Sequence, residues 1–277
     1  MLITWLTLAT VGLHGVVVGG SAVPSYTWDV MVFVQGWPPS QCVFLEDEKI
    51  KCAIPDKVSS WVAHGLWPTQ KGSQEPIKCN KTWKLDVNEL KTLRPKLDYR
   101  WASLRVDFGV ERENENLWRH EWMKHGTCAT TLSALKNPFH YFNATLSLMD
   151  SFNLLEMLTE EGIKPDQKKT YDYEDIRAAV QKHTGVTPCL VCIKDKEVEK
   201  TYLREVEIWL DKDFQPVNCL DNDLPAPGTH APHPLIFHSE LHVTYGALQA
   251  LHKSAYNTSH CPSTGIFYTP VHSKPAS

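Results

Sequence analysis

Eight cysteines constrain the fold of this 277-residue chain more than any other feature, because their number is even and they follow an apolar N-terminal segment. An exported chain meets an oxidising compartment in which cysteines pair. We therefore expect four disulfides that cross-link the chain over most of its length. The cysteines are Cys42, Cys52, Cys79, Cys128, Cys189, Cys192, Cys219 and Cys261.

The N-terminal segment is typical of a cleaved secretory signal, although no Lys or Arg precedes its apolar run at residues 1–18. A membrane anchor or a buried strand is the alternative, but a membrane span needs about 20 apolar residues, and two glycines and a histidine interrupt this run. We expect a signal peptide at 1–22, one domain at 23–277, and a secreted or lysosomal protein that passes through the endoplasmic reticulum. Glycosylation sequons, which agree with that route, begin at Asn80, Asn143 and Asn257.

The composition is that of an ordinary globular protein, since 42% of the residues are hydrophobic and 22% are charged. The formal net charge of −4 argues against a protein that holds duplex DNA on a broad basic surface. It is compatible with an enzyme that has a local basic cleft.

Helical and strand patterns are mixed along the chain without a repeating βαβ order. Alternating apolar residues of aromatic and β-branched type predict strands, and apolar residues three and four apart predict helices. We therefore expect an α+β fold of a single domain, with an antiparallel-type central sheet and packed helices. The predicted strands are 26–34, 198–210 and 266–268, and the predicted helices are 85–97, 117–127, 139–158 (one or two helices) and 173–183.

Two short segments carry the residue types of a catalytic site. The first runs Trp-Val-Ala-His-Gly-Leu-Trp-Pro at 61–68, and the second runs Arg-His-Glu-Trp-Met-Lys-His-Gly-Thr-Cys at 119–128. Because helical residues four apart lie on one side, the second segment presents two imidazoles, a carboxylate and an ammonium group together. These are His120, Glu121, Lys124 and His125.

A zinc site is the first alternative for the second segment. Metalloproteases place two zinc-binding histidines four residues apart, whereas His120 and His125 are five apart, which turns the second ring by about 140° on a regular α-helix. A solvated charged helix with chance histidines is the second alternative, but it does not explain His64 or the flanking Trp, Gly and Cys residues. We therefore expect no metal and no other cofactor.

The two segments resemble the catalytic segments of the ribonuclease T2 family, whose patterns are close to His-Gly-Leu-Trp-Pro and His-Glu-Trp-x-Lys-His-Gly-Thr-Cys. Residues 64–68 match the first pattern at every position, and residues 120–128 match the second, with methionine in the variable position. A weaker resemblance extends from Trp28 to about Pro270. The resemblance implies a ribonuclease T2-like catalytic domain over 23–277.

This resemblance implies an endoribonuclease that cleaves single-stranded RNA by transphosphorylation. The 2′-hydroxyl of the substrate attacks its own phosphorus, and a 2′,3′-cyclic phosphate forms before hydrolysis to a 3′-phosphate. The reaction needs a base and an acid but no protein nucleophile, and histidine, with a pKa of about 6.5, suits both tasks. By match to the family, His125 is the base, His64 the acid and His120 a phosphate ligand, while Glu121 and Lys124 stabilise the transition state.

Two residues are candidates for base recognition, one in the first motif and one in the weaker resemblance before it. We expect Trp67 to stack on a nucleobase, with core packing as the alternative, and Gln35 to contact a second base. The family often has Asp after its first motif, where this chain has Thr69. The base preference of the family therefore does not transfer to this chain.

The resemblance also implies a disulfide pattern. The family's pattern gives the pairs Cys42–Cys52, Cys79–Cys128 and Cys192–Cys261. Its remaining short bridge ends near Cys219, but the usual partner position holds Trp209 here, so we expect Cys219 to pair with Cys189, the cysteine left over. The spacing of Cys189 and Cys192 also occurs in redox motifs, but the βαβ context of such a motif is missing.

Two other classes of function remain as alternatives. The runner-up is an extracellular binding or signalling protein on the same fold, which the loss of a motif histidine would favour. A metal-dependent phosphodiester enzyme would be marked by a carboxylate-rich or His-x-x-x-His cluster. A group of four histidines late in the chain could bind a metal or sense pH, although an exposed loop is the plainer interpretation. These histidines are His230, His233, His238 and His242. We expect a monomer that binds single-stranded RNA, but neither DNA nor membranes, and that works best at about pH 5 to 6.5.

Overall fold

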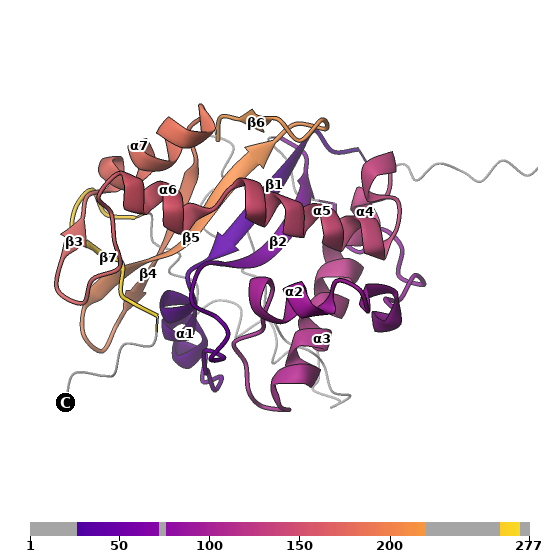
Figure 1. Ribbon diagram of the computed structural model, residues 1–277, viewed down its shortest axis with the longest axis horizontal. Coiled ribbons are helices and arrows are strands. Elements are labelled where there is room, and N and C mark those ends of the chain that lie inside the picture. Colours follow the sequence, from indigo (N-terminus) through magenta and orange to yellow (C-terminus); the bar gives the residue numbers. More distant parts are fainter. Residues whose placement is uncertain (1–26, 72–75, 220–260, 272–277) are drawn as a thin grey trace, which may run out of the picture.

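The strands in the described part of the chain form one sheet, with helices packed against it (Figure 1). The computed structural model describes residues 27–71, 76–219 and 261–271. The strands within these residues are β1 (Val30–Gly36), β2 (Val62–Thr69), β3 (Thr170–Tyr171), β4 (Cys189–Asp195), β5 (Lys200–Leu210), β6 (Pro216–Val217) and β7 (Ile266–Phe267). The sheet order is β2-β1-β5-β7-β3, and β4 and β6 also pair with β5.

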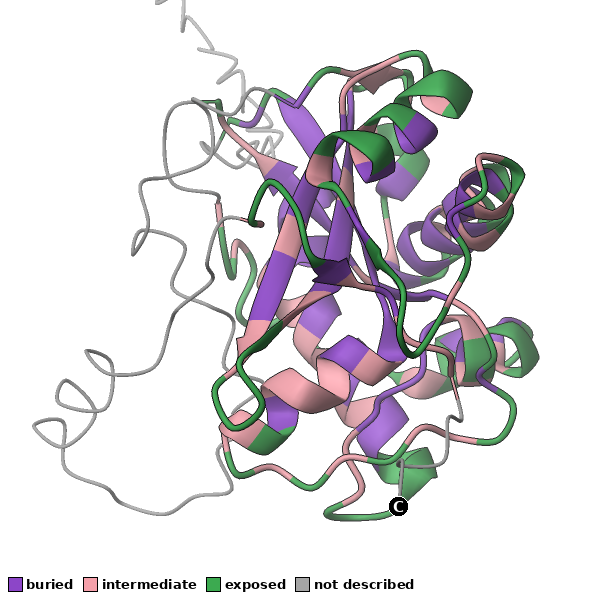
Figure 2. Ribbon diagram, turned by 90° about the vertical axis from the view of Figure 1, so that its left-hand side faces the viewer, coloured by how far each residue is buried: buried purple, intermediate pink, exposed green. Residues whose placement is uncertain are grey.

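Most of the helical segments lie between β2 and β4 along the chain. They are α1 (Pro38–Asp47), α2 (Arg94–Arg100), α3 (Val110–Glu121), α4 (Thr127–Ala129), α5 (Pro138–Ser151), α6 (Leu154–Glu160) and α7 (Tyr173–Thr184), together with the 3-10 turns η1 (Val87–Leu90) and η3 (Ser133–Leu135) and the π-helical segment η2 (Trp122–Gly126). Helices α5 and α6 run across one face of the sheet (Figure 1), and Figure 2 shows the helices gathered beside the nearly edge-on strands.

The expected α+β class is confirmed, with one correction to the sheet. Strand β5 is its central strand and pairs with β1, β4 and β6 in antiparallel orientation. Its pairing with β7 is parallel. The sheet is therefore mixed, because the chain returns to β5 from the distant segment 261–271 and not through a hairpin.

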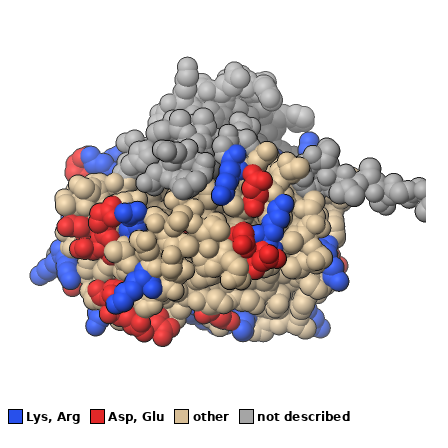
Figure 3. Space-filling model, turned by 90° about the horizontal axis from the view of Figure 1, so that it is seen from above, with Lys and Arg blue, Asp and Glu red and all other residues tan. Residues whose placement is uncertain are grey.

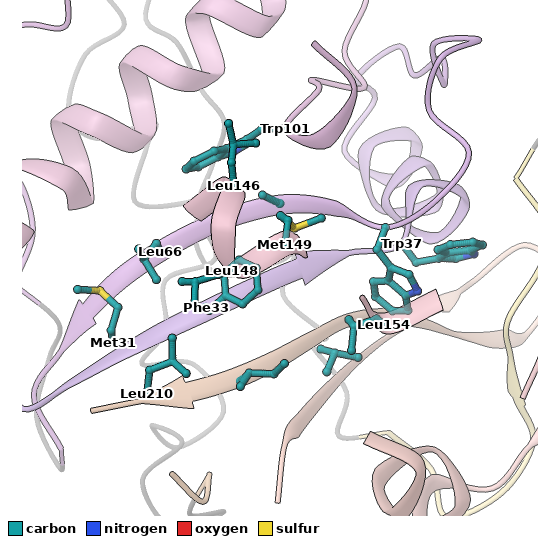
Figure 4. Close-up of a cluster of buried hydrophobic side chains, with 14 of the residues drawn as sticks. Met31, Phe33, Trp37, Leu66, Trp101, Leu146, Leu148, Met149, Leu154 and Leu210 are labelled. Atoms are coloured by element: carbon teal, nitrogen blue, oxygen red, sulfur yellow. The ribbon is translucent and has the colours of Figure 1, made fainter. Parts of the chain in front are cut away.

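The main hydrophobic core lies between the sheet and the helices that cover it. Each of its side chains labelled in Figure 4 is less than a tenth exposed, and burial of one such side chain stabilises the fold by about 1.5–3 kcal/mol. The core therefore holds three strands of the sheet at a fixed place against α5 and α6. Its labelled members are Met31, Phe33, Trp37, Leu66, Trp101, Leu146, Leu148, Met149, Leu154 and Leu210.

Several predicted elements are confirmed with shifted ends, among them β1, β5, α7 and the pair α5 and α6. Strand β2 escaped prediction because Gly65 and Pro68 are weak strand formers. Helix α1 escaped prediction as well. Pro38 ends β1, as expected, but it also starts α1, since proline fits the first turn of a helix.

The predicted helix at 85–97 is wrong in its extent. The segment forms the short turn η1, and a regular helix begins only at Arg94. Pro95 explains the break, because proline has no N–H to donate to a preceding turn and is therefore tolerated only in the first turn of a helix, where it stands in α2.

Four disulfides join the eight cysteines, all of which lie in the described residues. The pairs are Cys42–Cys52, Cys79–Cys128, Cys189–Cys219 and Cys192–Cys261, as expected. The bridge from Cys192 spans 69 residues and ties the C-terminal segment to β4. Trp61 adds to this anchoring, since its indole N–H donates to the hydroxyl of Tyr268 over 2.9 Å.

Strand β2 lies at an edge of the sheet, and two aromatic side chains cover its outer edge. The indole of Trp101 donates to the carbonyl oxygen of His64 over 3.2 Å, and the hydroxyl of Tyr141 donates to that of Leu66 over 2.9 Å. These bonds satisfy carbonyl groups that an exposed edge would leave open. They also fix the backbone of the first motif.

Some expectations lie outside the described residues. These are the signal peptide at 1–22, the sequon at Asn257 and the histidines at 230, 233, 238 and 242. Within the described part of the chain, no helix combines the length and the apolar character that crossing a membrane requires.

Candidate active site

His64 occupies a β-bulge in the middle of the first motif. Val34 of β1 pairs with Gly65, but the next residue, Gln35, pairs with Ala63, so His64 is the extra residue on β2. A bulge turns a side chain away from the regular alternation of a strand. His64 thereby avoids the main core and lies next to Trp67, with ring centroids 5.0 Å apart.

The second motif spans a change of helix type. Helix α3 ends at Glu121, the π-helical segment η2 follows, and α4 continues to Ala129. The expected rotation of about 140° between His120 and His125 holds for a regular α-helix only. In a π-helix residues five apart are linked by the backbone hydrogen bond. His120 stands at the end of α3, just before this segment, and its charge is one of the causes that lower the pKa of His125.

Trp67 joins the two motifs. Its ring meets His64 edge-on and stacks on His125 with centroids 5.1 Å apart and an interplanar angle of 27°. Its indole N–H donates to Oε2 of Glu121 over 3.0 Å. Trp67 is buried in a small cluster with the valines of β1. Its stacked neighbour is thus a motif imidazole, which agrees with the packing alternative for this residue.

Two glycines of the motifs are required by close packing. A Cβ atom at Gly65 would lie 1.9 Å from Nε1 of Trp67 and 2.5 Å from Oε2 of Glu121. A Cβ atom at Gly126 would lie 2.4 Å from Cε3 of Trp122. All three distances are shorter than atoms tolerate, so larger residues would push the aromatic rings and the carboxylate out of place.

Glu205 of β5 is a site residue that sequence reasoning missed. Its Oε1 accepts a hydrogen bond from Nδ1 of His64 over 2.8 Å. Gln41 and Arg204 donate to the same oxygen over 2.6 and 3.0 Å. Glu205 is 141 residues from His64 in the chain, and no local motif marks it. The sequence shows it only as one of the charged residues of a predicted strand, and its burial appears only in the structure.

The environments of the histidines give them different affinities for a proton. Burial disfavours the charged form of His64, but the Glu205 carboxylate and its hydrogen bond outweigh burial and raise the pKa of His64 above its ordinary value of 6.5. Burial and the ammonium group of Lys124 lower the pKa of His125 well below 6.5. The same two causes lower the pKa of His120 to about 3.

Lys124 and Lys78 form the positive side of the site. The positive charge of each lowers the pKa of His120. The backbone N–H of Lys78 donates to the carbonyl of Lys124 over 2.8 Å, and the disulfide Cys79–Cys128 fixes these two segments together. Among the described residues no group of three or more His, Cys, Asp and Glu side chains is arranged to hold a metal ion.

A pocket opens beside His64, and Gln35 does not line it. Gln35 is 1% exposed and donates to the carbonyl oxygen of Phe152 over 2.8 Å, on the side of the main core. Thr69 lies at the end of β2, where its hydroxyl donates to the carbonyl of Trp67. The pocket is lined by Gly36, Gln41, Leu45, Val62, Ala63, His64, Ala102, Ser103, Leu104, Arg105 and Leu117.

The two described sequons differ in their surroundings. Asn80 is exposed, and its side chain caps a turn by accepting bonds from Thr82. Asn143 is exposed on α5, but Thr145, the third residue of its sequon, is buried and donates to the carbonyl of Tyr141. Asn80 is therefore the more accessible of the two in the folded protein.

The fold and the two motifs define a class of protein, the disulfide-bonded α+β ribonucleases. The chain belongs to the ribonuclease T2 family, whose model, described as "Ribonuclease T2 family", matches residues 28–219. Ribonuclease Oy of Magallana gigas is 37% identical over 194 residues, which are 69% of this chain and 87% of the relative. Ribonuclease T2 of Homo sapiens is 32% identical over 208 residues, which are 73% of this chain and 75% of the relative.

Solved structures agree with this assignment. The crystal structure of RNase NT in complex with 5′-AMP has a TM-score of 0.65 and 25% identity, and the match covers 89% of this chain and all 100% of that chain. The crystal structure of human RNase T2 has a TM-score of 0.62 and 27% identity, with 88% and 99% covered. A mutant of RNase MC1 was solved in complex with 5′-GMP.

Proposed function

We propose that this protein is an endoribonuclease that cleaves single-stranded RNA by transphosphorylation, through a 2′,3′-cyclic phosphate to a 3′-phosphate. One observation carries the proposal. Two imidazoles flank the ring of Trp67, and their pKa values are displaced in opposite directions from 6.5. Pairs of titratable groups displaced in this way are typical of an acid and a base in one site.

The assignment of the two roles follows from those displacements. His125 is neutral in mildly acidic solution and can accept the proton of the 2′-hydroxyl. His64 keeps its proton over the same range and can donate it to the leaving 5′-oxygen. The nucleophile belongs to the substrate, so the chemistry asks the protein only for proton transfer and charge stabilisation.

The other motif residues act on the charge of the reacting phosphate. His120 is a neutral imidazole that can donate one hydrogen bond to a phosphate oxygen. Lys124 supplies a cation at the same place, where negative charge develops in the transition state. Glu121, held by Trp67, contributes to the raised pKa of His64.

The pocket beside His64 suits a nucleobase. Leu104 and Leu117 offer apolar contacts, and Ser103 and Arg105 offer polar ones. RNase NT and a mutant of RNase MC1 were solved with 5′-AMP and 5′-GMP, which supports nucleotide binding by this chain. On the face seen in Figure 3, basic and acidic side chains are interspersed, so the described part of this face offers no broad basic surface to RNA. The four disulfides support an exported, secreted or lysosomal protein.

The first prediction uses an oligonucleotide with a single ribonucleotide in a deoxy background. Because the 2′-hydroxyl is the nucleophile, cleavage should occur only on the 3′ side of the ribonucleotide. The first product should carry a 2′,3′-cyclic phosphate, which mass spectrometry detects. The all-deoxy oligonucleotide is the matched control and should stay intact. Cleavage at deoxy positions, or activity that a chelator abolishes and a divalent ion restores, would refute the mechanism.

The second prediction concerns pH. His125 must be neutral, and its lowered pKa moves the acid limit of kcat/KM below pH 6.5. His64 must be protonated, and its raised pKa moves the alkaline limit above pH 6.5. The bell-shaped profile should therefore be broad, with full activity on both sides of pH 6.5. We would measure kcat/KM of a dinucleotide from about pH 3 to about pH 9, which brackets both histidines. A maximum narrower than that of two unperturbed histidines would contradict the displaced pKa values.

A further inference from the structure

Glu205 is an ionised carboxylate in the interior of the protein. Only 3% of the residue is exposed. Burial by itself raises the pKa of a carboxyl group, but Arg204 and His64 outweigh this effect and hold the pKa of Glu205 well below its ordinary value of 4.5. A buried charge is costly unless it is paired and hydrogen-bonded. Glu205 meets that condition through Nδ1 of His64, Nε2 of Gln41 and Nη2 of Arg204.

Two β-bulges and one glycine of the sheet bring these groups together. His64 is the bulged residue of β2, and Arg204 is the bulged residue of β5, because Val191 pairs with Glu205 while Cys192 pairs with Leu203. Gly36 pairs with Glu205 from the neighbouring strand. A Cβ atom at Gly36 would lie 2.5 Å from Nε2 of Gln41, so glycine leaves the space through which Gln41 reaches the carboxylate.

We propose that Glu205 is the positioning residue of His64: its carboxylate binds Nδ1–H, so that the ring directs Nε2 to the leaving oxygen of the substrate. The proposal rests on the function proposed above and deepens it. An ionised carboxylate only accepts hydrogen bonds, so Nδ1 of His64 must carry a proton in both charge states of the ring. The proton that His64 gives up is then the one on Nε2, as in other sites where a carboxylate selects the tautomer of a catalytic histidine.

The carboxylate also sets how firmly His64 keeps its proton. The charged and titratable neighbours act on His64 in different directions: Glu205 and Glu121 favour its charged form, Arg204 disfavours it, and His120 and His125 are neutral in mildly acidic solution. Glu205 has the largest favourable effect and is also hydrogen-bonded to the ring. Its loss should therefore change the protonation of His64 more than the loss of Glu121.

Arg204 and Gln41 keep the carboxylate ionised and in place. The guanidinium group of Arg204 lies over the ring of Phe44 in α1, with its carbon 4.3 Å from the ring centroid. Gln41 comes from the same helix. Helix α1 thus braces Glu205 from one side, while β2 presents His64 from the other.

The first test needs no substitution. Nitrogen-15 NMR of His64 in the wild-type protein distinguishes a protonated from a bare ring nitrogen. Above the pKa of His64, the proposal expects the remaining proton on Nδ1 and a bare Nε2. A neutral ring with its proton on Nε2 would overturn the proposal, even if the enzyme cleaves RNA as proposed.

The second test compares Glu205→Gln with Glu161→Gln. The amide that replaces the carboxylate can still accept a bond from Nδ1 but has no charge, so the alkaline limit of kcat/KM should fall by about one pH unit. At about pH 8, kcat should drop about tenfold with little change in KM, whereas at about pH 5 the loss should be below about threefold. Glu161 is the matched control, because it contacts His183 between α6 and α7. Its substitution should leave the profile unchanged.

A double-mutant cycle separates positioning from general damage. In a His64→Ala background, Glu205→Gln should change the residual rate by less than about twofold, since Glu205 acts through His64. An unchanged alkaline limit in folded Glu205→Gln, or an undiminished loss in the His64→Ala background, would overturn the proposal. If wild-type protein cleaves no RNA, the proposed function fails instead, and the NMR result on Nδ1 still decides the hydrogen bond. The same NMR measurement decides the matter if Glu205→Gln does not fold.

Discussion

Replacement of His125 by alanine should reduce kcat/KM for RNA by at least about 100-fold, and replacement of His64 should do the same, since each removes one proton transfer of the reaction. His125 is fully buried and neutral beside Trp67, and His64 is held by Glu205. The double replacement should cost much less than the product of the two losses, because residues that act as one unit are not additive.

The two histidines can be told apart by the leaving group. A uridine 3′-phosphodiester with an aryl leaving group needs little protonation of that group, so it should recover most of the rate lost in His64→Ala. The same substrate should recover little in His125→Ala, because the 2′-hydroxyl still needs a base. His183→Ala is the matched control, since His183 contacts Glu161 away from the motifs. Equal recovery in both variants would show that the roles are assigned wrongly.

Replacement of Gly65 by alanine should damage both the fold and the reaction. The added methyl group would lie 1.9 Å from Nε1 of Trp67 and 2.5 Å from Oε2 of Glu121, so the ring and the carboxylate must move. Overpacking of this kind costs about 1–3 kcal/mol of unfolding free energy. Because Trp67 contacts both His64 and His125, kcat should also fall by about tenfold or more, since small displacements of reacting groups are costly.

Gly162→Ala provides the control for stability. Gly162 has a positive φ of 76°, and a Cβ atom there would meet nothing within 4 Å. Alanine at this position costs about 1–2 kcal/mol of strain but touches no catalytic residue. Chemical denaturation and single-turnover kinetics should therefore show a loss of stability in both variants and a loss of kcat in Gly65→Ala alone. A normal kcat in folded Gly65→Ala would show that the Trp67 ring does not position the histidines.

Local sequence patterns predicted the elements that depend on local physics. The alternation in β1 and β5 and the helical spacing in α5, α6 and α7 follow from side-chain periodicity. Strand β2 could not be found in this way, because its bulge at His64 breaks the alternation and Gly65 has no side chain to show it. The π-helical turn after Glu121 escaped prediction for a related reason: the pattern of residues four apart assumes a regular helix.

In the candidate site, too, some residues were predicted from the sequence, whereas the places of others appeared only in the structure. His64 and His125 were assigned as acid and base from the resemblance of two motifs to the family, and that resemblance depends only on the sequence. Trp67 showed its place only in the structure, where its face is stacked on His125. Gln35 likewise donates a hydrogen bond to the carbonyl oxygen of Phe152 in the interior, and the resemblance of sequence did not reveal this contact.

By itself, the sequence determined the residue types of the site and the number of cross-links, since both are written into short motifs and a count of cysteines. Only the tertiary structure supplied the surroundings that raise the pKa of His64 and lower that of His125. A pKa depends on burial and on charges within a few ångströms, and these come from distant parts of the chain. Glu205 lies 141 residues beyond His64, and only the pairing of β5 with β1, next to β2, brings its carboxylate to the ring.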